Sequence, residues 1–323
     1  MGRPRALVTA PLRGPGLDRL RDVADVEFDP WIDYQPIRLY GADDLAARLA
    51  EVSADLLVCE ADECRGPVFE QPLRVVASTR GDPTNVDVSG ATAAGIPVLH
   101  APGRNADGVA EIAVALMFAV NRHLVMGDRD MRAGTVFTDT IPYQRYRAWQ
   151  VGGRTVGLVG LGAVGRAAKW RFEGLGMRVI AYDPYQPDAD CDLDELLATA
   201  DVVSMHAPAM PETEGMIGAE QFAAMRPGTI YLNTARAALH DTDALVEALA
   251  SGHLGGAGLD HVQGEILPPD HPLTKLDNVV LTPHIGGATY DTEVNQTDMV
   301  VEDICRLLAG ERPHRLANPE VWR

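Results

Sequence analysis

The sequence predicts an α/β protein with two doubly wound parallel sheets and a cleft between the two domains. Short apolar runs rich in β-branched residues alternate with helical patterns along the chain, which is typical of βαβ units and a parallel sheet. The 323 residues are more than one hydrophobic core usually organises and suffice for two domains. The hydrophobic fraction of 46% and the charged fraction of 23% are those of an ordinary globular protein.

Five apolar runs in the first third of the chain predict strands. They cover residues 6–10, 23–28, 54–59, 74–79 and 96–100. Residues 41–52 and 85–95 carry helical patterns between these runs, and Gly95 ends the second helix. The alternation predicts a first doubly wound unit of roughly a hundred residues.

A long helix is predicted over residues 107–124, because its apolar residues recur at helical spacing. They are Val109, Ile112, Ala113, Leu116, Met117 and Val120. A face this broad indicates burial between domains or subunits. The polar and aromatic stretch at residues 135–150 follows. It is interpreted either as an arm that packs on a partner chain or as a loop on its own subunit, and the sequence leaves both open.

A second α/β unit begins at Gly153. Its predicted strands are the runs RTVGLVG, MRVIAYD, DVVSMHA, GTIYLN, GAGLD and NVVLT, with helices at 165–174, 192–200, 218–225 and 241–251. A last helical pattern covers residues 291–310 and ends at Gly310, with Pro313 beyond it. Because this final helix could cross back to the first unit, the predicted domains are 1–103 plus 290–323, and 104–289.

Charge and cysteine usage exclude several classes of protein. The net charge of −18 argues against nucleic acid or an anionic membrane as a partner, since both would be repelled. No apolar run approaches a membrane span, and the first residues lack the apolar core of a signal peptide. The four cysteines form no C-x-x-C pair and no zinc-type cluster with histidine. We therefore expect reduced thiols, no metal and a cytoplasmic protein.

The segment TVGLVGLGAVGRAAKW places Gly160, Gly162 and Gly165 in a G-x-G-x-x-G pattern. The pattern follows an apolar strand and opens a helix, and a second strand ends in Asp183, 23 positions after Gly160. That complete context is the dinucleotide-binding fingerprint, in which the glycines let the backbone approach the pyrophosphate at the helix N-terminus. Arg166 follows the pattern directly and could add a phosphate contact.

Asp183 predicts the choice of dinucleotide. A carboxylate at this position accepts hydrogen bonds from the ribose hydroxyls and repels a 2′-phosphate. The neighbouring residues Tyr182, Pro184 and Tyr185 include no arginine to neutralise such a phosphate. The sequence therefore predicts NAD rather than NADP as the cofactor.

Three later apolar runs each lead to one residue that could bind a substrate or transfer a proton: Arg236, Glu265 and His284. Ligands bind at the carboxyl edge of an open α/β sheet, where such residues would emerge. A guanidinium can hold a substrate carboxylate bidentately and polarise the adjacent carbonyl. A histidine can exchange a proton with a 2-hydroxyl while hydride moves to or from the nicotinamide, and a carboxylate beside it orients the ring and favours its cation.

Other residues near these runs have less specific signals. Asp260 also ends a strand and could meet the nicotinamide carboxamide or its ribose. His206 follows a strand and could form a wall of the cofactor site, whereas His261 and His271 flank the loop of Glu265. We favour non-catalytic roles for these three histidines.

The chain resembles the D-isomer-specific 2-hydroxyacid dehydrogenases from about residue 74 to residue 310. The segments that carry the resemblance are NVDVSGATAAGIPV, NADGVAEIAVALM, GLVGLGAVGR, HAPAMPETEGMI, NTAR, DALVEALASGHLGGAGLD, PPDHPL and NVVLTPHIGGAT. The resemblance implies two Rossmann-like domains with the active site in the cleft, usually in a homodimer. It also implies that Arg236, Glu265 and His284 form the catalytic triad.

The same resemblance bears on the remaining site residues. We expect the cofactor to contact Gly160, Gly162, Ala163, Val164, Gly165, Asp183, His206, Ala207, Pro208, Thr213, Thr234, Ala235, Asp260, His284 and Gly286. We expect the substrate to contact Arg80, Gly81, Arg236 and His284. Domain 104–289 would hold NAD, and domain 1–103 plus 290–323 would complete the substrate site.

The chain departs from the family pattern in three places. The family's N-T-A-R-G ends here in Ala237, and its D-V-F-x-x-E-P becomes D-H-V-Q-G-E-I, from Asp260 to Ile266. The glycine-rich substrate loop becomes Ser78-Thr79-Arg80-Gly81-Asp82-Pro83. In the family the backbone amides of that loop hold the substrate carboxylate. Here Arg80 either contacts a phosphate or hydroxyl of the substrate or is a surface arginine in a turn.

The sequence thus predicts an NAD-dependent oxidoreductase that interconverts a D-2-hydroxy acid and its 2-keto acid. A regulatory protein that binds NAD(H), similar to the dehydrogenase-like corepressors, is an alternative, because those proteins keep the same three catalytic residues. A formate- or phosphite-type enzyme is a third reading. Formate enzymes of this fold typically carry glutamine at the position of Glu265, which argues against them.

Overall fold

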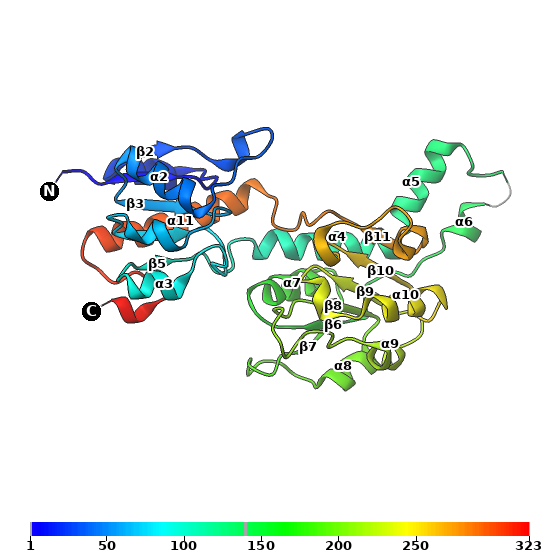
Figure 1. Cartoon of the computed structure of the whole chain (residues 1–323). Helices are drawn as coiled ribbons and strands as arrows, with labels where there is room; N and C mark the ends of the chain where they lie inside the picture. The colour runs from blue at the N-terminus through cyan, green and yellow to red at the C-terminus, as the bar shows by residue number, and fades with distance from the viewer. Residues whose placement is uncertain (1, 139–140, 323) are drawn as a thin grey trace. The chain divides into compact units, whose positions relative to one another are not determined.

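The computed structural model describes residues 2–138 and 141–322, which form two compact units. Unit 1 comprises residues 1–104 and 289–323, and unit 2 comprises residues 105–288. Each unit contains one parallel sheet with helices on both faces (Figure 1). The chain is therefore an α/β protein with two doubly wound sheets, as predicted.

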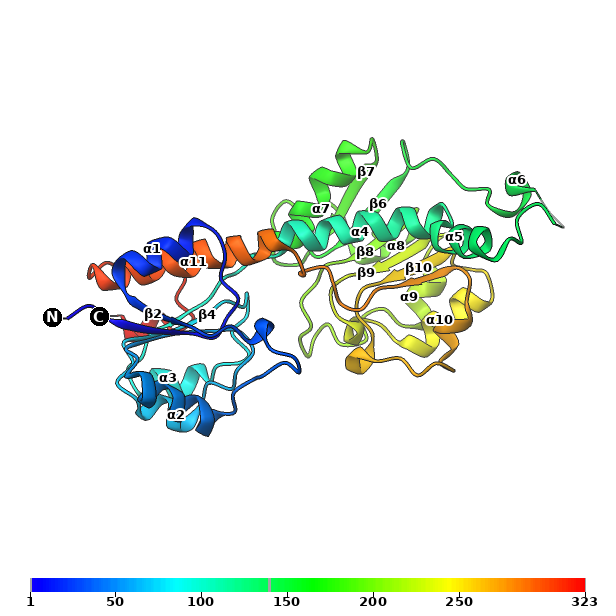
Figure 2. The ribbon, with the colours of Figure 1, turned by 90° about the horizontal axis from the view of Figure 1, so that it is seen from above.

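The sheet of unit 1 has the strand order β2-β1-β3-β4-β5 and is parallel throughout. Its elements are β1 (Arg5–Val8), α1 (Pro15–Val23), β2 (Asp25–Phe28), α2 (Ala42–Val52), β3 (Leu56–Cys59), β4 (Val75–Ser78), α3 (Val88–Ala93), β5 (Val98–Leu99) and α11 (Tyr290–Leu308). Helices α1 and α11 cover one face and α2 and α3 the other (Figure 2). Alternate strand residues supply the two cores: Ala6 and Val8 face α1 and α11, whereas Leu7 faces α2.

The sheet of unit 2 has the order β11-β10-β9-β8-β6-β7 and is also parallel throughout. Its elements are α4 (Ala106–Asn121), α5 (Leu124–Ala133), α6 (Pro142–Arg145), β6 (Thr155–Val159), α7 (Ala163–Gly174), β7 (Arg178–Tyr182), α8 (Leu193–Thr199), β8 (Val202–Met205), α9 (Ala219–Ala224), β9 (Ile230–Asn233), α10 (Thr242–Ala250), β10 (Gly256–Leu259) and β11 (Val279–Leu281). Helices α4 and α7 bury one face of the sheet, and α8, α9 and α10 bury the other.

The chain order reverses between β6 and β8, so this sheet has a topological switch point there. Ligands of open α/β sheets bind outside the carboxyl ends of the strands at such a point. The six strand ends lie side by side at spacings of about 4.8 Å, which gives an edge roughly 24 Å long. An elongated ligand can therefore contact the loops of several strands at once.

The predicted strands are all present, with ends that differ by a few residues, but two helix predictions were incomplete. The helix expected over residues 107–124 ends at Asn121, where His123 adopts a positive φ of 52° and a separate helix, α5, begins. Helix α1 was not predicted, because Pro15 and Gly16 begin it and polar residues interrupt its apolar face. Of the stretch at 135–150, only α6 is regular, and residues 139 and 140 lie outside the described part.

The four cysteines are free thiols in this structure. Within the described residues, no single helix has the length and apolarity to cross a membrane. Helices α4 and α5 reach that length and apolarity only when taken as a pair, and the pair is bent by 56°.

Candidate active site

The three residues predicted to be catalytic follow three neighbouring strands of unit 2. Arg236 lies just beyond β9, Glu265 in the loop after β10, and His284 just beyond β11. Strand β10 pairs with β9 on one side and with β11 on the other, all in parallel. The carboxyl ends of the three strands therefore bring a guanidinium, a carboxylate and an imidazole to one edge of the sheet.

Glu265 and His284 form a hydrogen-bonded pair. The Nδ1 atom of His284 lies 2.9 Å from Oε1 of Glu265, and both side chains are about half exposed. A carboxylate only accepts hydrogen bonds, so Nδ1 carries the proton in this arrangement. The nitrogen that remains for a substrate is therefore Nε2 of His284.

The backbone of this pair is held in a sparsely populated conformation. Glu265 has a φ of 64° and His284 a φ of 55°, and the residue before Glu265 is a glycine in the same region. Each such non-glycine residue costs roughly 1–3 kcal/mol, which the surrounding structure must offset. Strain of this kind clusters at active sites, so its occurrence at both members of the pair supports a functional role.

Asp260 holds the loop of His284 in place. This buried carboxylate accepts hydrogen bonds from the Thr282 hydroxyl at 2.6 Å, from the Ile285 amide at 2.9 Å and from the Gly286 amide at 2.7 Å. Three donors on one carboxylate fix the backbone on both sides of His284. The structure thus gives Asp260 an anchoring role, and the contact predicted between Asp260 and the cofactor stays a prediction.

Arg236 presents an unpaired guanidinium to solvent. Its side chain is exposed, and Nη1 donates a hydrogen bond to the Ala235 carbonyl oxygen at 2.8 Å. Among residues 2–138 and 141–322, no carboxylate lies within salt-bridge distance of it. The expected alternative for such an arginine, a structural salt bridge, is thus not formed within this part of the chain. The guanidinium is free to bind an anionic substrate group.

Asn233 shapes the turn that carries Arg236. Its buried amide donates to the Arg236 carbonyl oxygen at 2.9 Å and accepts from the Ala235 amide at 3.0 Å. The same amide lies 2.9 Å from Nδ1 of His240, which is also within 3.2 Å of the Tyr231 hydroxyl. Burial lowers the pKa of His240 to about 4, so its ring stays neutral and accepts these bonds. Sequence reasoning did not identify Asn233 or His240 as supports of the site.

His261 is a third residue whose contacts in the site the sequence did not reveal. Its Nε2 lies 3.1 Å from Oε1 of Glu265, and its Nδ1 accepts a hydrogen bond from the Ala237 amide at 3.1 Å. The rings of His261 and His284 meet edge to face with centroids 4.9 Å apart. One carboxylate oxygen therefore lies between two imidazoles.

These three side chains also bear on whether a metal ion could bind. His261, Glu265 and His284 each offer one ligand atom, and these atoms lie within 4.8 Å of one another. The Glu265 oxygen is also in polar contact with both imidazoles, with a hydrogen bond from Nδ1 of His284 and a distance of 3.1 Å to Nε2 of His261. Contacts among the three side chains themselves therefore account for the closeness of these atoms.

The glycine-rich loop after β6 has the geometry that a bound pyrophosphate requires. Gly160 has a φ of 101°, and a Cβ there would lie 2.6 Å from the Ala207 nitrogen. A Cβ on Gly165 would overlap the Gly160 carbonyl oxygen, so this glycine lets α7 approach β6 closely. Gly162, at the N-cap of α7, has no atom within 4 Å of a Cβ position and no capping side chain. Open space beside free helix N–H groups is where a phosphate binds.

The residues beyond β7 favour a ribose without a 2′-phosphate. The Asp183 carboxylate accepts hydrogen bonds from the Leu161 and Tyr185 amides at 2.8 and 2.9 Å, which fixes it beside the glycine loop. Arg166 could supply a phosphate contact only by leaving Asp188, whose carboxylate it contacts through two nitrogens. The carboxylates of Asp183 and Asp188, both beyond the end of β7, would repel a 2′-phosphate.

Two unpartnered polar atoms belong to residues directly beyond β8 and β9. Nδ1 of His206 and Oγ1 of Thr234 are enclosed but have no hydrogen-bond partner in the described part of the chain. Burial lowers the pKa of His206 to about 4, so its ring is neutral, with Nε2 bonded to the Ser204 hydroxyl at 2.9 Å. Buried polar atoms are nearly always satisfied. Both belong to residues expected to contact the cofactor, and a bound dinucleotide fits this site.

The remaining predicted site residues lie in the first turn of α7 or in loops of the two units. Ala163, Val164, Ala207, Pro208, Thr213, Ala235 and Gly286 lie in unit 2, at or beside the carboxyl ends of its strands. Thr213 bonds within its own loop, to the Pro208 carbonyl oxygen at 2.7 Å. Arg80 and Gly81 belong to unit 1, in the loop after β4, where the Gly81 carbonyl oxygen lies 2.8 Å from Nδ1 of His100. Their part in substrate binding stays a prediction.

Comparison with protein families gives one match that covers more than half of the chain. Residues 114–286 match the model described as D-isomer specific 2-hydroxyacid dehydrogenase, NAD binding domain. The chain is 36% identical to a glyoxylate reductase of Thermofilum pendens, and the alignment covers 100% of this chain and 97% of the relative. It is 37% identical to a D-3-phosphoglycerate dehydrogenase of Archaeoglobus fulgidus over 74% of this chain and 46% of that longer protein.

A solved structure supports the same relationship. A crystal structure of a Thermus thermophilus protein matches with a TM-score of 0.82 and 38% sequence identity. The match covers 97% of this chain and 99% of the other, so both units are included.

Proposed function

The chain belongs to the D-isomer specific 2-hydroxyacid dehydrogenase family, and from this premise we propose that Arg236, Glu265 and His284 carry out its reaction on a short 2-keto acid. Members of this family are NAD-dependent oxidoreductases, and this chain is one of them. It interconverts a D-2-hydroxy acid and its 2-keto acid with NAD(H) as cofactor. The observation that carries the proposal is the hydrogen bond between Glu265 and His284 beside an unpaired Arg236.

Arg236 binds and orients the substrate in this proposal. Its guanidinium receives the substrate carboxylate through two parallel hydrogen bonds, which fixes the direction of the neighbouring carbonyl group. The positive charge also polarises that carbonyl. Asn233 contributes by holding the turn, because its amide contacts the backbone on both sides of the Arg236 side chain.

His284 moves the proton. In the direction of reduction, its Nε2–H faces the carbonyl oxygen and donates a proton to it as the bond order of the carbonyl falls. Glu265 accepts the Nδ1–H bond and stabilises the imidazolium before the transfer. The nicotinamide cofactor, when bound, supplies the hydride to the carbonyl carbon. In oxidation, neutral His284 takes the hydroxyl proton back.

We propose a small, unphosphorylated 2-keto acid such as glyoxylate as the first substrate to be tested. The glyoxylate reductase of Thermofilum pendens aligns with this chain over essentially its whole length. The D-3-phosphoglycerate dehydrogenase relatives are longer proteins, of which the chain covers 46% in Archaeoglobus fulgidus and 58% in Mycobacterium tuberculosis. Whole-length similarity supports a shared substrate site more strongly than partial similarity does.

The expected result of a substrate panel is NADH oxidation with short 2-keto acids. The panel comprises glyoxylate, hydroxypyruvate, pyruvate and phosphohydroxypyruvate, with loss of NADH absorbance as the measurement. We expect the highest kcat/KM with glyoxylate or hydroxypyruvate. Turnover with phosphohydroxypyruvate alone would refute the substrate proposal, and NADH binding without turnover of any acid would support a regulatory protein.

Unit 1 is proposed to complete the substrate site through Arg80 and Gly81. Arg80 has no salt bridge within the residues that the structure describes, and its amide lies 3.3 Å from the Ser78 hydroxyl oxygen. The turn is held by a bond from the Ala101 amide to the Arg80 carbonyl oxygen at 2.8 Å. Unit 1 would then be the substrate domain and unit 2 the NAD-binding domain. We also propose that the protein is cytoplasmic.

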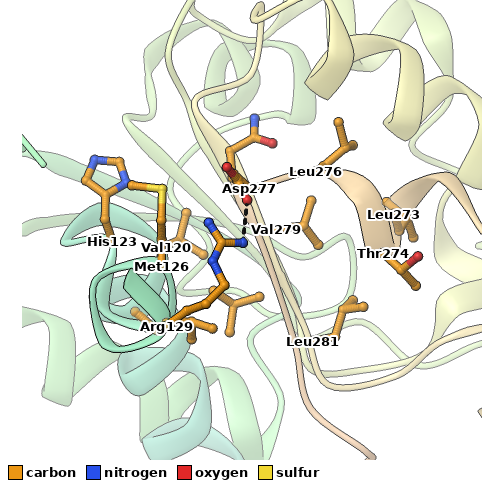
Figure 3. Close-up of a pocket in the computed structure, with 14 residues that line it drawn as sticks. Val120, His123, Met126, Arg129, Leu273, Thr274, Leu276, Asp277, Val279 and Leu281 are labelled. Carbon is orange, nitrogen blue, oxygen red and sulfur yellow. Dashed lines mark hydrogen bonds and ion pairs between the residues drawn. The ribbon is translucent and has the colours of Figure 1, made fainter. Parts of the chain in front are cut away.

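A homodimer is also proposed, with the region of α5 and α6 as its contact surface. Seven large apolar side chains are exposed there: Leu124, Val125, Met131, Phe137, Ile141, Tyr143 and Trp149. Beside α5 runs a groove lined by Val120, Met126, Leu273, Val279 and Leu281, crossed by the ion pair of Arg129 and Asp277 (Figure 3). Apolar surface on this scale supports a second copy as the partner.

The dimer proposal predicts that one charge on this surface separates the subunits. Tyr143 is 83% exposed, and Tyr143→Asp should change the mass measured by light scattering from twice 34.7 kDa to 34.7 kDa. Ile37→Asp is the matched control, because Ile37 is 60% exposed and lies in unit 1. A wild-type mass of 34.7 kDa, or a Tyr143→Asp variant with unchanged mass, would refute this surface as the interface.

A further inference from the structure

We propose that His261 is a positioning residue that holds Glu265 against His284 and joins this pair to the turn of Arg236. The inference rests on the acid–base roles proposed above for Glu265 and His284. It assigns a function to a side chain that stands where the family pattern has a valine, in D-V-F, and this chain has D-H-V. Valine has no polar atom in its side chain, so these contacts are specific to the sequence of this chain.

The contacts form one continuous series of polar contacts. The Ala237 amide donates a hydrogen bond to Nδ1 of His261 at 3.1 Å, and Nε2 of His261 lies within ion-pair distance, 3.1 Å, of Oε1 of Glu265. The same oxygen lies 2.9 Å from Nδ1 of His284. Since Ala237 directly follows Arg236, the series of contacts runs from the turn of the guanidinium to the acid–base pair.

The direction of these bonds fixes the protonation of His261. A backbone amide can only donate, so Nδ1 of His261 must be the unprotonated nitrogen and Nε2 carries the hydrogen. Burial lowers the pKa of His261, which keeps the ring neutral. His261 therefore places an N–H group 3.1 Å from the carboxylate oxygen without adding a positive charge that would compete with the His284 imidazolium.

Glu265 needs such a support because little else restrains it. Its side chain is 53% exposed, its backbone has a φ of 64°, and Gly264 precedes it. A half-exposed glutamate with a single partner samples several rotamers, and ordering a flexible side chain carries an entropy cost. A second nitrogen in contact with the same oxygen reduces that freedom. The His261 side chain, 14% exposed, is itself packed and can act as a fixed support.

The test is a double-mutant cycle between His261 and Glu265. His261→Phe keeps a planar ring but removes the hydrogen bond from Ala237 and the polar contact with Glu265, and His261→Gln keeps a donor and an acceptor. We expect His261→Phe to lower kcat for keto acid reduction on the order of 10-fold, the effect of losing a polar contact with a charged group. NADH affinity should be unchanged, and His261→Gln should restore part of the loss.

The cycle separates positioning from a general structural effect. In a Glu265→Ala background, His261→Phe should lower kcat less than about 2-fold, because the group it positions is gone. An equal loss in both backgrounds, or no loss in the wild type, would overturn the inference. The folding of each variant is checked by its NADH affinity and thermal midpoint. A His284→Asn variant with wild-type turnover would refute the proposed mechanism itself. If His284→Asn is inactive and His261→Phe has wild-type turnover, only the role of His261 is refuted.

Discussion

Replacing His284 with asparagine should lower kcat for 2-keto acid reduction by a factor of roughly 100 to 10,000, the usual contribution of a general acid. Asparagine cannot supply the proton, and it tolerates the φ of 55° that His284 adopts better than alanine does. NADH affinity should remain close to that of the wild type, because Asp260 still holds the backbone of this loop through the Ile285 and Gly286 amides. Steady-state rates and NADH fluorescence titration measure the two effects.

His271→Ala is the control for this experiment. His271 flanks the same region, but its Nδ1 bonds to the Leu273 amide within its own turn at 3.2 Å. Turnover in this variant should stay within about 3-fold of the wild type, as is usual for a substitution away from the chemistry. A His284→Asn variant as active as His271→Ala would show that another group moves the proton.

Gly165→Ala should abolish tight NADH binding, with Kd higher by on the order of 100-fold, about 2.7 kcal/mol. The added Cβ would overlap the Gly160 carbonyl oxygen, which is backbone and cannot move aside cheaply. Helix α7 would have to move away from β6, and overpacking of this kind also costs about 1–3 kcal/mol of stability. Isothermal titration with NADH and a thermal melt record both effects.

Gly174→Ala on the same helix is the matched control. A Cβ on Gly174 would meet no atom within 4 Å, and alanine is favoured over glycine in a helix by about 1 kcal/mol. We expect unchanged NADH affinity and equal or higher stability. Equal NADH affinity in Gly165→Ala and the wild type would mean that the glycine loop does not contact the dinucleotide.

Most strands of both sheets could be predicted because they are short apolar runs that are buried on both faces; the edge strand β2 is largely exposed. Leu56, Leu57 and Val58 in β3 illustrate this, since all three are fully buried. The break between α4 and α5 could not be predicted, because it depends on the left-handed backbone of His123 rather than on the apolar pattern. Helix α1 was missed for a related reason: its packing against α11, far away in sequence, supplies its stability.

The order of the strands explains why the three chemical residues could be recognised from sequence. Parallel strands place the residues after their carboxyl ends on one edge, so Arg236, Glu265 and His284 come together once β9, β10 and β11 are neighbours. The contacts of Asn233 and His261, which support the site, could not be predicted in this way. They depend on the directions of the two side chains, and the sequence pattern does not contain these directions.

The most direct test of the central claim follows the hydride itself. Hydroxypyruvate is reduced with NADH that carries deuterium at the transferring position of the nicotinamide ring, and the product is analysed by NMR and for chirality. We expect deuterium at C2 of the 2-hydroxy acid and the D configuration at that carbon. A product without deuterium at C2, or one with the L configuration, would contradict it.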